Sequence, residues 1–451
     1  MAKYQKYAEY KDSGIEWLGE IPSHWDVKRL GSFFEERREK VSDVDYPALS
    51  VTKNGIVPQL DTAAKTDAGD NRKLVKVNDF VINSRSDRKG SSGISPYTGS
   101  VSLISIVMEP HRIYPAYAHH LLRSYPFQEE FYRYGKGIVA DLWSTNSSEM
   151  KNILLPDIPI IEQQKIASFL EHETAKIDTL IAKQEKLIEL LKEKRQAVIS
   201  HAVTKGLNPN VPMKDSGVEW LGEVPEHWKV APIKRIIHLM EQGKSPECEN
   251  ISATSEQWGV LKTSCVNNGI FHSQQNKALP EHIKPHIQYQ VKAGDVLMSR
   301  ASGSINLIGS VALVPNDVQE NLLLSDKIFR IHLTKDCDSR FFTLLMATPY
   351  MRTLIERAIS GAEGMANNIT KTAILDFVSA IPPLKEQVEL VDYLTQKIQV
   401  FDSLVVKESQ AIEVMQERRT ALISAAVTGK IDVRNWQNPN KNNEVNMELS
   451  A

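Results

Sequence analysis

The stretch KDSGIEWLGEIPSHW, Lys11–Trp25, occurs again almost unchanged as KDSGVEWLGEVPEHW, Lys214–Trp228. Twelve of the fifteen positions are identical, and two of the three differences exchange Ile for Val. We call these segments the first box and the second box; they are 203 residues apart. So close an internal repeat predicts a fold built from two matching halves.

Two more segments repeat downstream of the boxes, in the same order. IPIIEQQKIASFL, from Ile158, resembles IPPLKEQVELVDYL, from Ile381. KRQAVISHAVTKG, from Lys194, resembles RRTALISAAVTGK, from Arg418, at an offset of 224 residues. Each half therefore consists of a box, a variable region and a helix-like segment. A chain of 451 residues is also long enough for two or more domains.

Each repeated helix-like segment predicts one long helix. The first, 160–204, contains neither Gly nor Pro, follows Pro159 and ends before Gly206, a candidate C-terminal cap. The second, 384–428, is flanked in the same way. Each helix would be about 67 Å long.

The apolar residues of both segments recur at alternating steps of three and four, which is typical of a coiled-coil seam. The seam residues are Leu170, Ile177, Ile181, Ile188, Leu191 and Val198 in the first helix, and Leu394, Ile398, Phe401, Val405, Ile412, Met415 and Leu422 in the second. Two matched seams in one chain most simply bury each other. The alternative is that each seam packs on a partner elsewhere.

Polar residues interrupt both seams at corresponding places. Gln184 corresponds to Glu408, and Arg195 corresponds to Arg419. Such residues can fix the register of a coiled coil at some cost in stability. The alternative is that these long side chains extend to the surface. The matched interruptions predict two antiparallel helices with Gln184 close to Glu408.

The variable regions, 28–157 and 231–381, barely resemble each other, but both mix short strand-like and helix-like runs. We expect each to be a compact α/β domain with a small twisted sheet. Each contains a Gly/Ser-rich basic loop after a strand, NSRSDRKGSSG (83–93) and SRASGSINLIG (299–309). Residues 71–90 carry six bases and two acids.

These loops favour DNA binding, because phosphates attract Arg and Lys and base edges accept Arg or Asn. An ordinary solvated loop is the alternative at each position. The candidate DNA-binding residues are Asn83, Ser84, Arg85, Arg88, Lys89, Lys136, Lys262, Asn267, Asn268, Ser299, Arg300, Ser302, Asn306, Asn367 and Asn368.

Composition sets further limits. The net charge is −2, so any attraction for nucleic acid must be local. No apolar run reaches the length of a membrane span, and the first residues have no hydrophobic core typical of a secretory signal. The three cysteines lie far apart, which predicts neither a disulfide framework nor a zinc site and fits a reducing cytoplasm.

No catalytic motif is complete in this sequence. The methyltransferase tetrapeptide (Asp or Asn, Pro, Pro, then Phe or Tyr) does not occur. Gly243-Lys244-Ser245 resembles the end of a phosphate-binding loop, but His238 stands where the motif needs a glycine. The pair His119-His120 lies in a helix-like run and is expected at the surface or in the core. A cryptic enzyme and a coiled-coil scaffold without DNA contact remain the alternatives.

Together these features resemble the specificity (S) subunit of type I restriction-modification systems. The resemblance rests on the duplicated WLGExPxHW box, the Gly-Asp-x-Leu strand with its Ser-Arg loop, and the P-x-x-EQ helix start. It covers the chain to about residue 430. Its most specific elements are Glu16–Trp25, Glu219–Trp228, Glu162–Gln163 and Glu386–Gln387. The first variable region departs from the pattern, because Asn78-Asp79 stands where the second has Gly294-Asp295.

The resemblance implies an α/β (α+β) fold: two target-recognition domains with small twisted sheets, separated by two long antiparallel coiled-coil helices in an internal pseudo-twofold repeat. The interface of the helix pair would include Gln184 and Glu408 besides the apolar seam. The expected domains are 1–27 (first box), 28–157 (first target-recognition domain), 158–206 (first helix), 207–230 (second box and linker), 231–381 (second target-recognition domain), 382–430 (second helix) and 431–451 (polar tail).

The resemblance also implies the function. Each domain would recognise one half of a bipartite site in double-stranded DNA. Two modification subunits would dock on this chain and methylate adenine with S-adenosylmethionine that they bind themselves. Motor-nuclease subunits would complete the restriction complex, and this chain would hold no cofactor or metal. The tail, 432–451, has six Asn, and we expect it to be poorly ordered or lightly docked.

Overall fold

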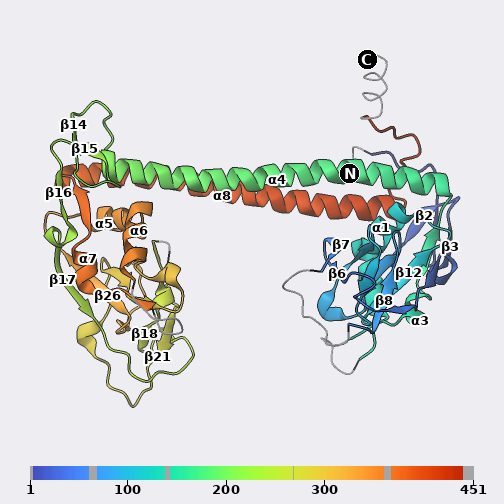
Figure 1. Ribbon diagram of the computed structural model, residues 1–451, viewed down its shortest axis with the longest axis horizontal. Coiled ribbons are helices and arrows are strands. Elements are labelled where there is room, and N and C mark those ends of the chain that lie inside the picture. The colour runs from blue at the N-terminus through green and yellow to red at the C-terminus, as the bar shows by residue number, and fades with distance from the viewer. Residues whose placement is uncertain (1–3, 60–68, 138–142, 268, 360–366, 440–451) are drawn as a thin grey trace. The chain divides into compact units, whose positions relative to one another are not determined.

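The computed structural model describes residues 4–59, 69–137, 143–267, 269–359 and 367–439 (Figure 1). The chain forms two compact units, one from residues 1–185 and 409–451 and the other from residues 186–408. We call them unit 1 and unit 2. Two long helices, α4 (Ile160–Lys205) and α8 (Leu384–Val427), each begin in one unit and end in the other.

Unit 1 is built around a four-stranded antiparallel sheet in the order β10-β9-β12-β4. Its described strands are β1 (Tyr10–Asp12), β2 (Glu20–Pro22), β3 (Asp26–Arg29), β4 (Phe34–Glu36), β5 (Lys40–Val41), β6 (Leu49–Thr52), β7 (Gly55–Pro58), β8 (Arg72–Val75), β9 (Phe80–Asn83), β10 (Ser92–Ile94), β11 (Gly99–Val101), β12 (Ser105–Pro110) and β13 (Leu154–Asp157). Its short helices are α1 (Pro115–Arg123), α2 (Tyr125–Arg133), α3 (Ser147–Met150) and the 3-10 turns η1 (Leu30–Ser32) and η2 (Ser86–Arg88).

Unit 2 has a four-stranded sheet of the same connectivity, in the order β24-β22-β26-β17. Its described strands are β14 (Met213–Asp215), β15 (Glu223–Pro225), β16 (Lys229–Pro232), β17 (Ile237–Gln242), β18 (Gly259–Leu261), β19 (Val266–Asn267), β20 (Ile270–Phe271), β21 (Asn276–Ala278), β22 (Val296–Ser299), β23 (Ala301–Ser302), β24 (Val311–Leu313), β25 (Leu322–Leu323), β26 (Ile328–Leu333), β27 (Asn367–Asn368) and β28 (Val378–Ile381). Its helices are α5 (Ser339–Met346), α6 (Pro349–Ala358), α7 (Lys371–Leu375), η4 (Ile233–Arg235), η5 (Thr263–Cys265), η6 (Ile287–Tyr289) and η7 (Ile305–Leu307).

The central sheet of each unit is buried on both faces, so its strands alternate between two cores. Phe80 and Ile82 of β9 join the large core with α1 and α2, whereas Val81 between them joins a small core on the other face. Met298 and Leu297 of β22 divide in the same way in unit 2. The expected α/β domains are confirmed, and the two have the same core topology although their sequences barely match.

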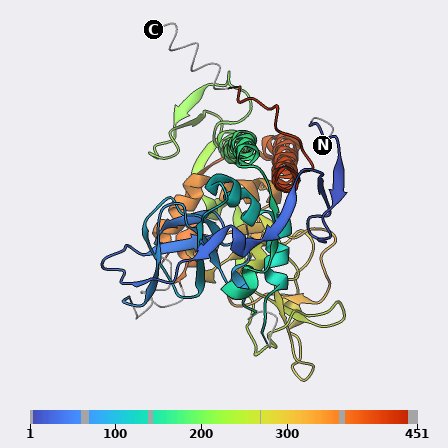
Figure 2. The same cartoon turned by 90° about the vertical axis from the view of Figure 1, so that its right-hand side faces the viewer.

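The two long helices are confirmed, with ends within one residue of the predicted ones. Gly206 and Gly429 follow them with φ of +77° and +76°, the left-handed conformation that favours glycine at a helix end. In each unit the beginning of one helix packs against the end of the other. Ile166 and Leu170 share a core with Leu422 and Ala426 in unit 1, and Leu390 and Leu394 share one with Ile199 and Val203 in unit 2. The helices are therefore antiparallel within each unit (Figures 1 and 2).

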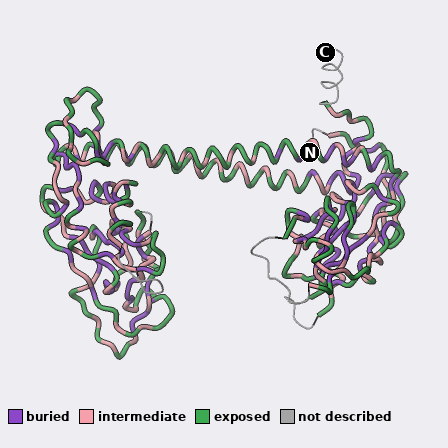
Figure 3. Tube along the Cα trace, in the orientation of Figure 1, coloured by how far each residue is buried: buried purple, intermediate pink, exposed green. Residues whose placement is uncertain are grey.

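The predicted seam residues lie on the less exposed side of both helices, and the middle of the pair has few buried residues (Figure 3). Leu170, Ile177, Leu394 and Leu422 are buried. Ile181, Gln184, Ile188, Leu191, Val198, Ile398, Phe401, Val405, Glu408, Ile412 and Met415 are half-buried. The proximity of Gln184 to Glu408 stays a prediction, because the two residues belong to different units.

The arginines that interrupt the seams pair across the helices. Arg419 of α8 forms an ion pair with Asp178 of α4 in unit 1, with Nε 2.8 Å from Oδ1. Arg195 of α4 forms the equivalent pair with Asp402 of α8 in unit 2, at 3.1 Å. The offset of 224 relates the two pairs to each other. This supports the register-fixing interpretation over a simple extension to the surface.

The expectation of a lightly docked tail is wrong for residues 432–436. Val433 is buried, and the ring of Trp436 packs edge-on against Phe169 at a centroid distance of 5.6 Å. The Asp432 N–H donates to the Gln5 carbonyl at 2.9 Å. Burial of these apolar side chains outweighs the polar composition around them. Residues 440–451 lie outside the described part of the chain.

Candidate nucleic-acid interface

The first box is fixed to the start of α4 by one carboxylate. Glu162 accepts hydrogen bonds from Trp25 Nε1 at 3.1 Å and from the Tyr7 hydroxyl at 2.6 Å, and His24 Nε2 lies 3.0 Å from it. We call His24, Trp25 and Glu162 the first clamp. Trp25 is fully buried and Glu162 is 6% exposed. Burial and the Glu162 carboxylate together raise the pKa of Tyr7, which therefore stays a donor.

The second box repeats this arrangement at the start of α8. Trp228 Nε1 donates to Glu386 at 3.0 Å, and His227 Nε2 lies 2.8 Å from the same carboxylate. We call His227, Trp228 and Glu386 the second clamp. Asn210 stands where the box offset places a counterpart of Tyr7, and the Glu386 side chain is 28% exposed. The box is therefore repeated because each helix start needs one.

The glutamine after each clamp carboxylate braces the neighbouring domain. Gln163 accepts from the Tyr114 N–H, which precedes α1, at 2.8 Å. Gln387 accepts from the Asp338 N–H, which precedes α5, at 2.9 Å. The Glu-Gln pair thus connects box, long helix and recognition domain in each unit. This contact gives the P-x-x-EQ motif at each helix start its structural role.

An aspartate before each central strand closes the turn that leads into the strand. Asp79 accepts from the Lys76 N–H at 2.8 Å, and Asp295 accepts from the Lys292 N–H at 2.9 Å. The preceding residues, Asn78 and Gly294, have φ of +74° and +82°. Asn tolerates this left-handed conformation better than most residues with a side chain. The departure of the first region from the Gly-Asp pattern therefore leaves its backbone unchanged.

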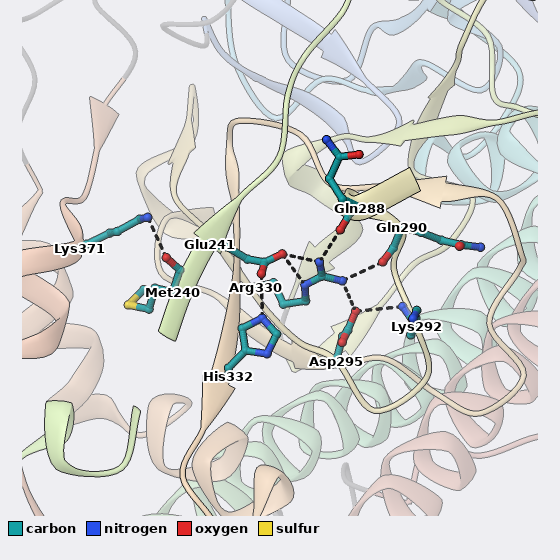
Figure 4. Close-up of polar contacts among 9 residues, drawn as sticks. All are labelled: Met240, Glu241, Gln288, Gln290, Lys292, Asp295, Arg330, His332 and Lys371. Atoms are coloured by element: carbon teal, nitrogen blue, oxygen red, sulfur yellow. Dashed lines mark hydrogen bonds and ion pairs between the residues drawn. The ribbon is translucent and has the colours of Figure 1, made fainter. Parts of the chain in front are cut away.

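In both units an arginine neutralises this aspartate. Arg37 binds Asp79 with two hydrogen bonds, of 2.7 and 3.0 Å. Arg330 of β26 lies 3.1 Å from Asp295 and also binds Glu241 of β17, which in turn contacts His332 (Figure 4). Burial opposes ionisation of Glu241, but the hydrogen bonds from Arg330 and His332 outweigh it and lower its pKa. These pairs were not predicted from the sequence, because each joins segments that are far apart in the chain.

Unit 1 brings most of its candidate residues to one edge. The loop after β9, residues 83–91, lies beside residues 143–145: the Thr145 N–H donates to the Ser84 carbonyl at 3.0 Å, and the Ser86 N–H to the Trp143 carbonyl at 2.9 Å. Lys136 pairs its backbone with Ser144. We call this loop and segment the first recognition edge. Its exposed side chains are those of Arg85, Asp87, Arg88, Lys89, Trp143 and Ser144, and the neighbouring Lys136 is exposed as well.

Unit 2 forms the corresponding edge from residues 299–310 and 367–369, which we call the second recognition edge. β23 pairs with β27, placing Ala301 opposite Asn368 and Ser302 opposite Asn367. The Ile369 N–H donates to the Arg300 carbonyl at 3.0 Å. The structure thus joins two candidate clusters that lie far apart in the sequence.

The two edges share a backbone but not their side chains. The contact from Thr145 to Ser84 corresponds to the contact from Ile369 to Arg300, so Ser84, and not Arg85, is the counterpart of Arg300. Arg85 is exposed, whereas Arg300 is half-buried, with its guanidinium 5.9 Å from the Phe329 ring centre. Residues 84–85 lead to the turn η2, and residues 300–304 lead to η7. The second loop is therefore the longer one.

The remaining candidates are distributed as follows. Ser84, Ser299 and Ser302 are buried, so they support the loops from behind. Asn306 is exposed on η7, and Asn83, Lys262, Asn267, Asn367 and Asn368 are half-buried. Among the described residues no hydrogen bond or ion pair joins Lys262 or Asn267 to the second recognition edge. Asn268 lies outside the described residues. All these DNA contacts stay predictions.

The same described ranges give no sign of a metal site or a membrane span. No group of three His, Cys, Asp or Glu there could hold a metal ion, and no helix there could cross a membrane. The histidine pair is half-buried on α1. Burial, followed by the charge of Arg123, lowers the pKa of His119 to about 3 and that of His120 to about 4. Both histidines are neutral at ordinary pH.

Comparison with known proteins gives a consistent picture. The profile of the family described as type I restriction modification DNA specificity domain matches residues 225–414. The MjaVIII specificity subunit of Methanocaldococcus jannaschii is 25% identical over 92% of this chain and 95% of its own length. The EcoEI specificity subunit of Escherichia coli is 29% identical over 53% of this chain, which spans only 40% of that relative.

A solved structure has the same fold. It comes from work on complex assembly and conformational transition of the type I R-M system. The TM-score is 0.63, with 14% sequence identity, over 91% of this chain and 99% of the other.

Proposed function

We propose, on the premise that this chain belongs to the specificity subunits of type I restriction-modification systems, that each unit recognises one half of a bipartite DNA target. In this family the subunit recognises DNA and catalysis lies in partner subunits. The observation that carries the proposal is the matched pair of recognition edges. One backbone arrangement presents two different sets of basic and amide side chains.

The difference between the edges implies an asymmetric target. The first edge offers Arg85, Arg88, Lys89 and Lys136, whereas the second offers Arg300 with a pair of asparagines. Arg binds guanine and Asn binds adenine through paired hydrogen bonds in the major groove. Two unlike sets of side chains would therefore select two unlike half-sites.

The long helices supply the spacer. α4 and α8 each continue from one unit into the other, and the ion pairs Asp178–Arg419 and Arg195–Asp402 fix their register. The number of unread base pairs between the half-sites then follows from helix length. The clamps at both helix starts attach the helices to the recognition domains, so helix length would set the distance between the domains.

Partner subunits complete the system. We infer that double-stranded DNA, two modification subunits and motor-nuclease subunits assemble on this chain in the cytoplasm. S-adenosylmethionine would be held by the modification subunits, so this chain would need no cofactor of its own. The net charge of −2 fits a subunit whose attraction for DNA is confined to its recognition edges.

Substitution of the two arginines tests the proposal. Arg85→Ala should weaken DNA binding by about 1–3 kcal/mol and relax one half-site, because a base-reading arginine acts on its own position. Arg300→Ala should relax the other half-site. The measurement is binding of the complex to duplexes that vary each half-site, combined with methylation mapping.

Exposed arginines away from the edges serve as controls: Arg29→Ala on β3 and Arg235→Ala on η4 should leave both half-sites intact. A uniform loss across all sequences would assign the arginine to phosphate. A variant that behaves like wild type would refute the edge assignment. Binding that does not weaken with salt would favour a scaffold without DNA contact, and methyl transfer by this chain alone would establish an enzyme.

A further inference from the structure

The incomplete phosphate-loop motif Gly243-Lys244-Ser245 directly follows β17 and packs against the turn that leads into β26. The Gly243 N–H donates to the Ser325 carbonyl at 3.1 Å, and the Lys244 N–H donates to the Leu324 carbonyl at 3.2 Å. A Cβ atom on Gly243 would lie 1.8 Å from the Leu324 carbonyl oxygen, so this approach requires glycine. The glycine of the motif therefore serves a contact within unit 2.

Ser245 binds Asp326 of the same turn through two hydrogen bonds. The Ser245 hydroxyl donates to the Asp326 carboxylate, and the Asp326 N–H donates back to the hydroxyl oxygen at 3.3 Å. This reciprocal pair fixes the side chain and the peptide of Asp326 together. The segment 243–245 thus holds the backbone of residues 324–326 at three successive positions.

The turn that Ser245 holds also binds Arg300, the arginine of the second recognition edge. The Arg300 N–H donates to the Lys327 carbonyl at 2.8 Å, and Nη1 donates to the Asp326 carbonyl at 3.2 Å. The guanidinium also lies 5.9 Å from the ring centre of buried Phe329. Among the described residues no other hydrogen bond or ion pair involves it, so Nε and Nη2 remain free to donate. Two parallel donors of a guanidinium match the O6 and N7 atoms of guanine.

A second cation limits the orientations that Arg300 can adopt. Lys371 Nζ donates to the Met240 carbonyl at 2.8 Å (Figure 4) and lies 5.5 Å from the Phe329 ring centre. Like charges repel, so Lys371 opposes any movement of the Arg300 guanidinium toward it. The acceptor at Asp326 and the like charge at Lys371 therefore act together to restrict the guanidinium.

In the described part of unit 1 this support has no equivalent. The counterpart of Arg300 is Ser84, whose short side chain is buried. The strand register places exposed Leu103 where unit 2 has Asp326. No hydrogen bond among the described residues joins Leu103 to the segment that follows β4. The support therefore accompanies the arginine, and is not part of the strand framework that both units share.

We propose that Ser245 is a positioning residue for DNA recognition: through Asp326 it holds the Arg300 guanidinium so that Nε and Nη2 reach one guanine of the second half-site. This rests on the proposed function, since it requires that Arg300 reads a base. Without this support the guanidinium keeps its charge and its attraction for DNA, but it samples more orientations. Loss of the Ser245 hydroxyl relaxes the choice of base without a comparable loss of affinity for other sequences.

The test is binding of the complex to duplexes that vary, one base pair at a time, the half-site that Arg300→Ala relaxes. Ser245→Ala should lower the preference for the base pair that Arg300 reads by about threefold to tenfold, a part of the discrimination that a bidentate arginine supplies. Ser245→Thr keeps a hydroxyl and should restore the preference. Ser252→Ala removes another exposed serine hydroxyl of unit 2, which donates to the Gln274 carbonyl, and is the matched control. Equal unfolding midpoints will show that the variants are folded.

A double variant shows whether Ser245 acts through Arg300. In the Arg300→Ala background, Ser245→Ala should change the base preference no further. The salt dependence of binding should stay as in wild type in Ser245→Ala, because no charge is lost. An equal effect of Ser245→Ala with and without Arg300, or wild-type preference in Ser245→Ala, would overturn the inference and leave the proposed function standing. If Arg300→Ala itself relaxes neither half-site, the edge assignment in the proposed function fails together with the inference.

Discussion

At the scale of single residues, the two clamp carboxylates occupy equivalent places in unlike surroundings. Glu162 accepts from Trp25 and Tyr7 and is 6% exposed, whereas Glu386 is 28% exposed. Removal of a clamp carboxylate leaves its buried donors without a hydrogen-bond acceptor, which costs about 1–3 kcal/mol. We therefore expect Glu162→Leu to lower the free energy of unfolding by about that amount, and Glu386→Leu by less.

Denaturant unfolding, followed by tryptophan fluorescence, measures both effects. Glu356→Leu on α6, an exposed glutamate outside the clamps, is the control. Equal losses of unfolding free energy in the two variants would show that the difference in burial between Glu162 and Glu386 does not affect stability.

The histidine pair on α1 makes unit 1 sensitive to acid. The pKa of His119 is lowered to about 3 and that of His120 to about 4, chiefly by burial and then by Arg123, with Arg419 of α8 adding to it. The unfolded chain regains the ordinary pKa of about 6.5. Below that pH the unfolded chain binds protons at these histidines, whereas the folded unit keeps them neutral. The free energy of unfolding therefore falls as the pH drops, by up to about 1.4 kcal/mol per pH unit for each histidine.

Unfolding at pH 7.5 and pH 5.5 should show this loss in wild type. His119→Gln should reduce it, and His238→Gln, at an exposed site on β17, should not. The same pH dependence in all three proteins would exclude His119 as the proton acceptor.

At the scale of elements, the interhelical ion pairs are expected to set register more than stability. Asp178 and Arg419 are both partly exposed, so their coupling in a double-mutant cycle should be about 0.2–1 kcal/mol. The charge-exchanged variant Asp178→Arg with Arg419→Asp should recover the stability that either single change loses. A coupling near zero, with no recovery on exchange, would leave the apolar seam as the sole determinant of register.

The long helices were predictable because their signals are local. An absence of Gly and Pro, a preceding proline and a seven-residue apolar repeat specify each helix without knowledge of the rest of the chain. The caps at Gly206 and Gly429 follow from the same local rules.

The recognition edges were predictable only in part. The basic loops are visible in the sequence, but their pairing with residues 143–145 and 367–369 joins strand fragments of two to four residues. Fragments that short have no distinctive periodicity, so their partners are set by tertiary packing.

The docking of the tail could have been predicted from its sequence, despite its high asparagine content. Ile431 and Val433 alternate with polar residues, as in a half-buried strand.

At the scale of the whole molecule, helix length should determine the target spacer. Inserting four residues after Lys186 of α4 adds about 6 Å along its axis, and one base pair occupies about 3.4 Å. The unread gap should then grow by one or two base pairs, with both half-sites unchanged. Seven inserted residues should disturb the seam less than four, because a heptad keeps the apolar face aligned.

Methylation mapping with the inserted variants measures the gap. An active variant with the original spacer would show that the helices do not set it. Four residues replaced at the same place, without change of length, provide the matched control.

The two boxes also allow recombination within the gene. A crossover that joined the first box to the second would delete 203 residues, leaving one box, the second recognition domain and α8. That shortened protein would keep a complete clamp, since Trp25 would meet Glu386. Its helix carries both Asp402 and Arg419, the counterparts of Asp178 and Arg195, so two copies of α8 could form both ion pairs with each other. Such a dimer would recognise a palindrome, and a single genetic event would give the host a new methylation pattern.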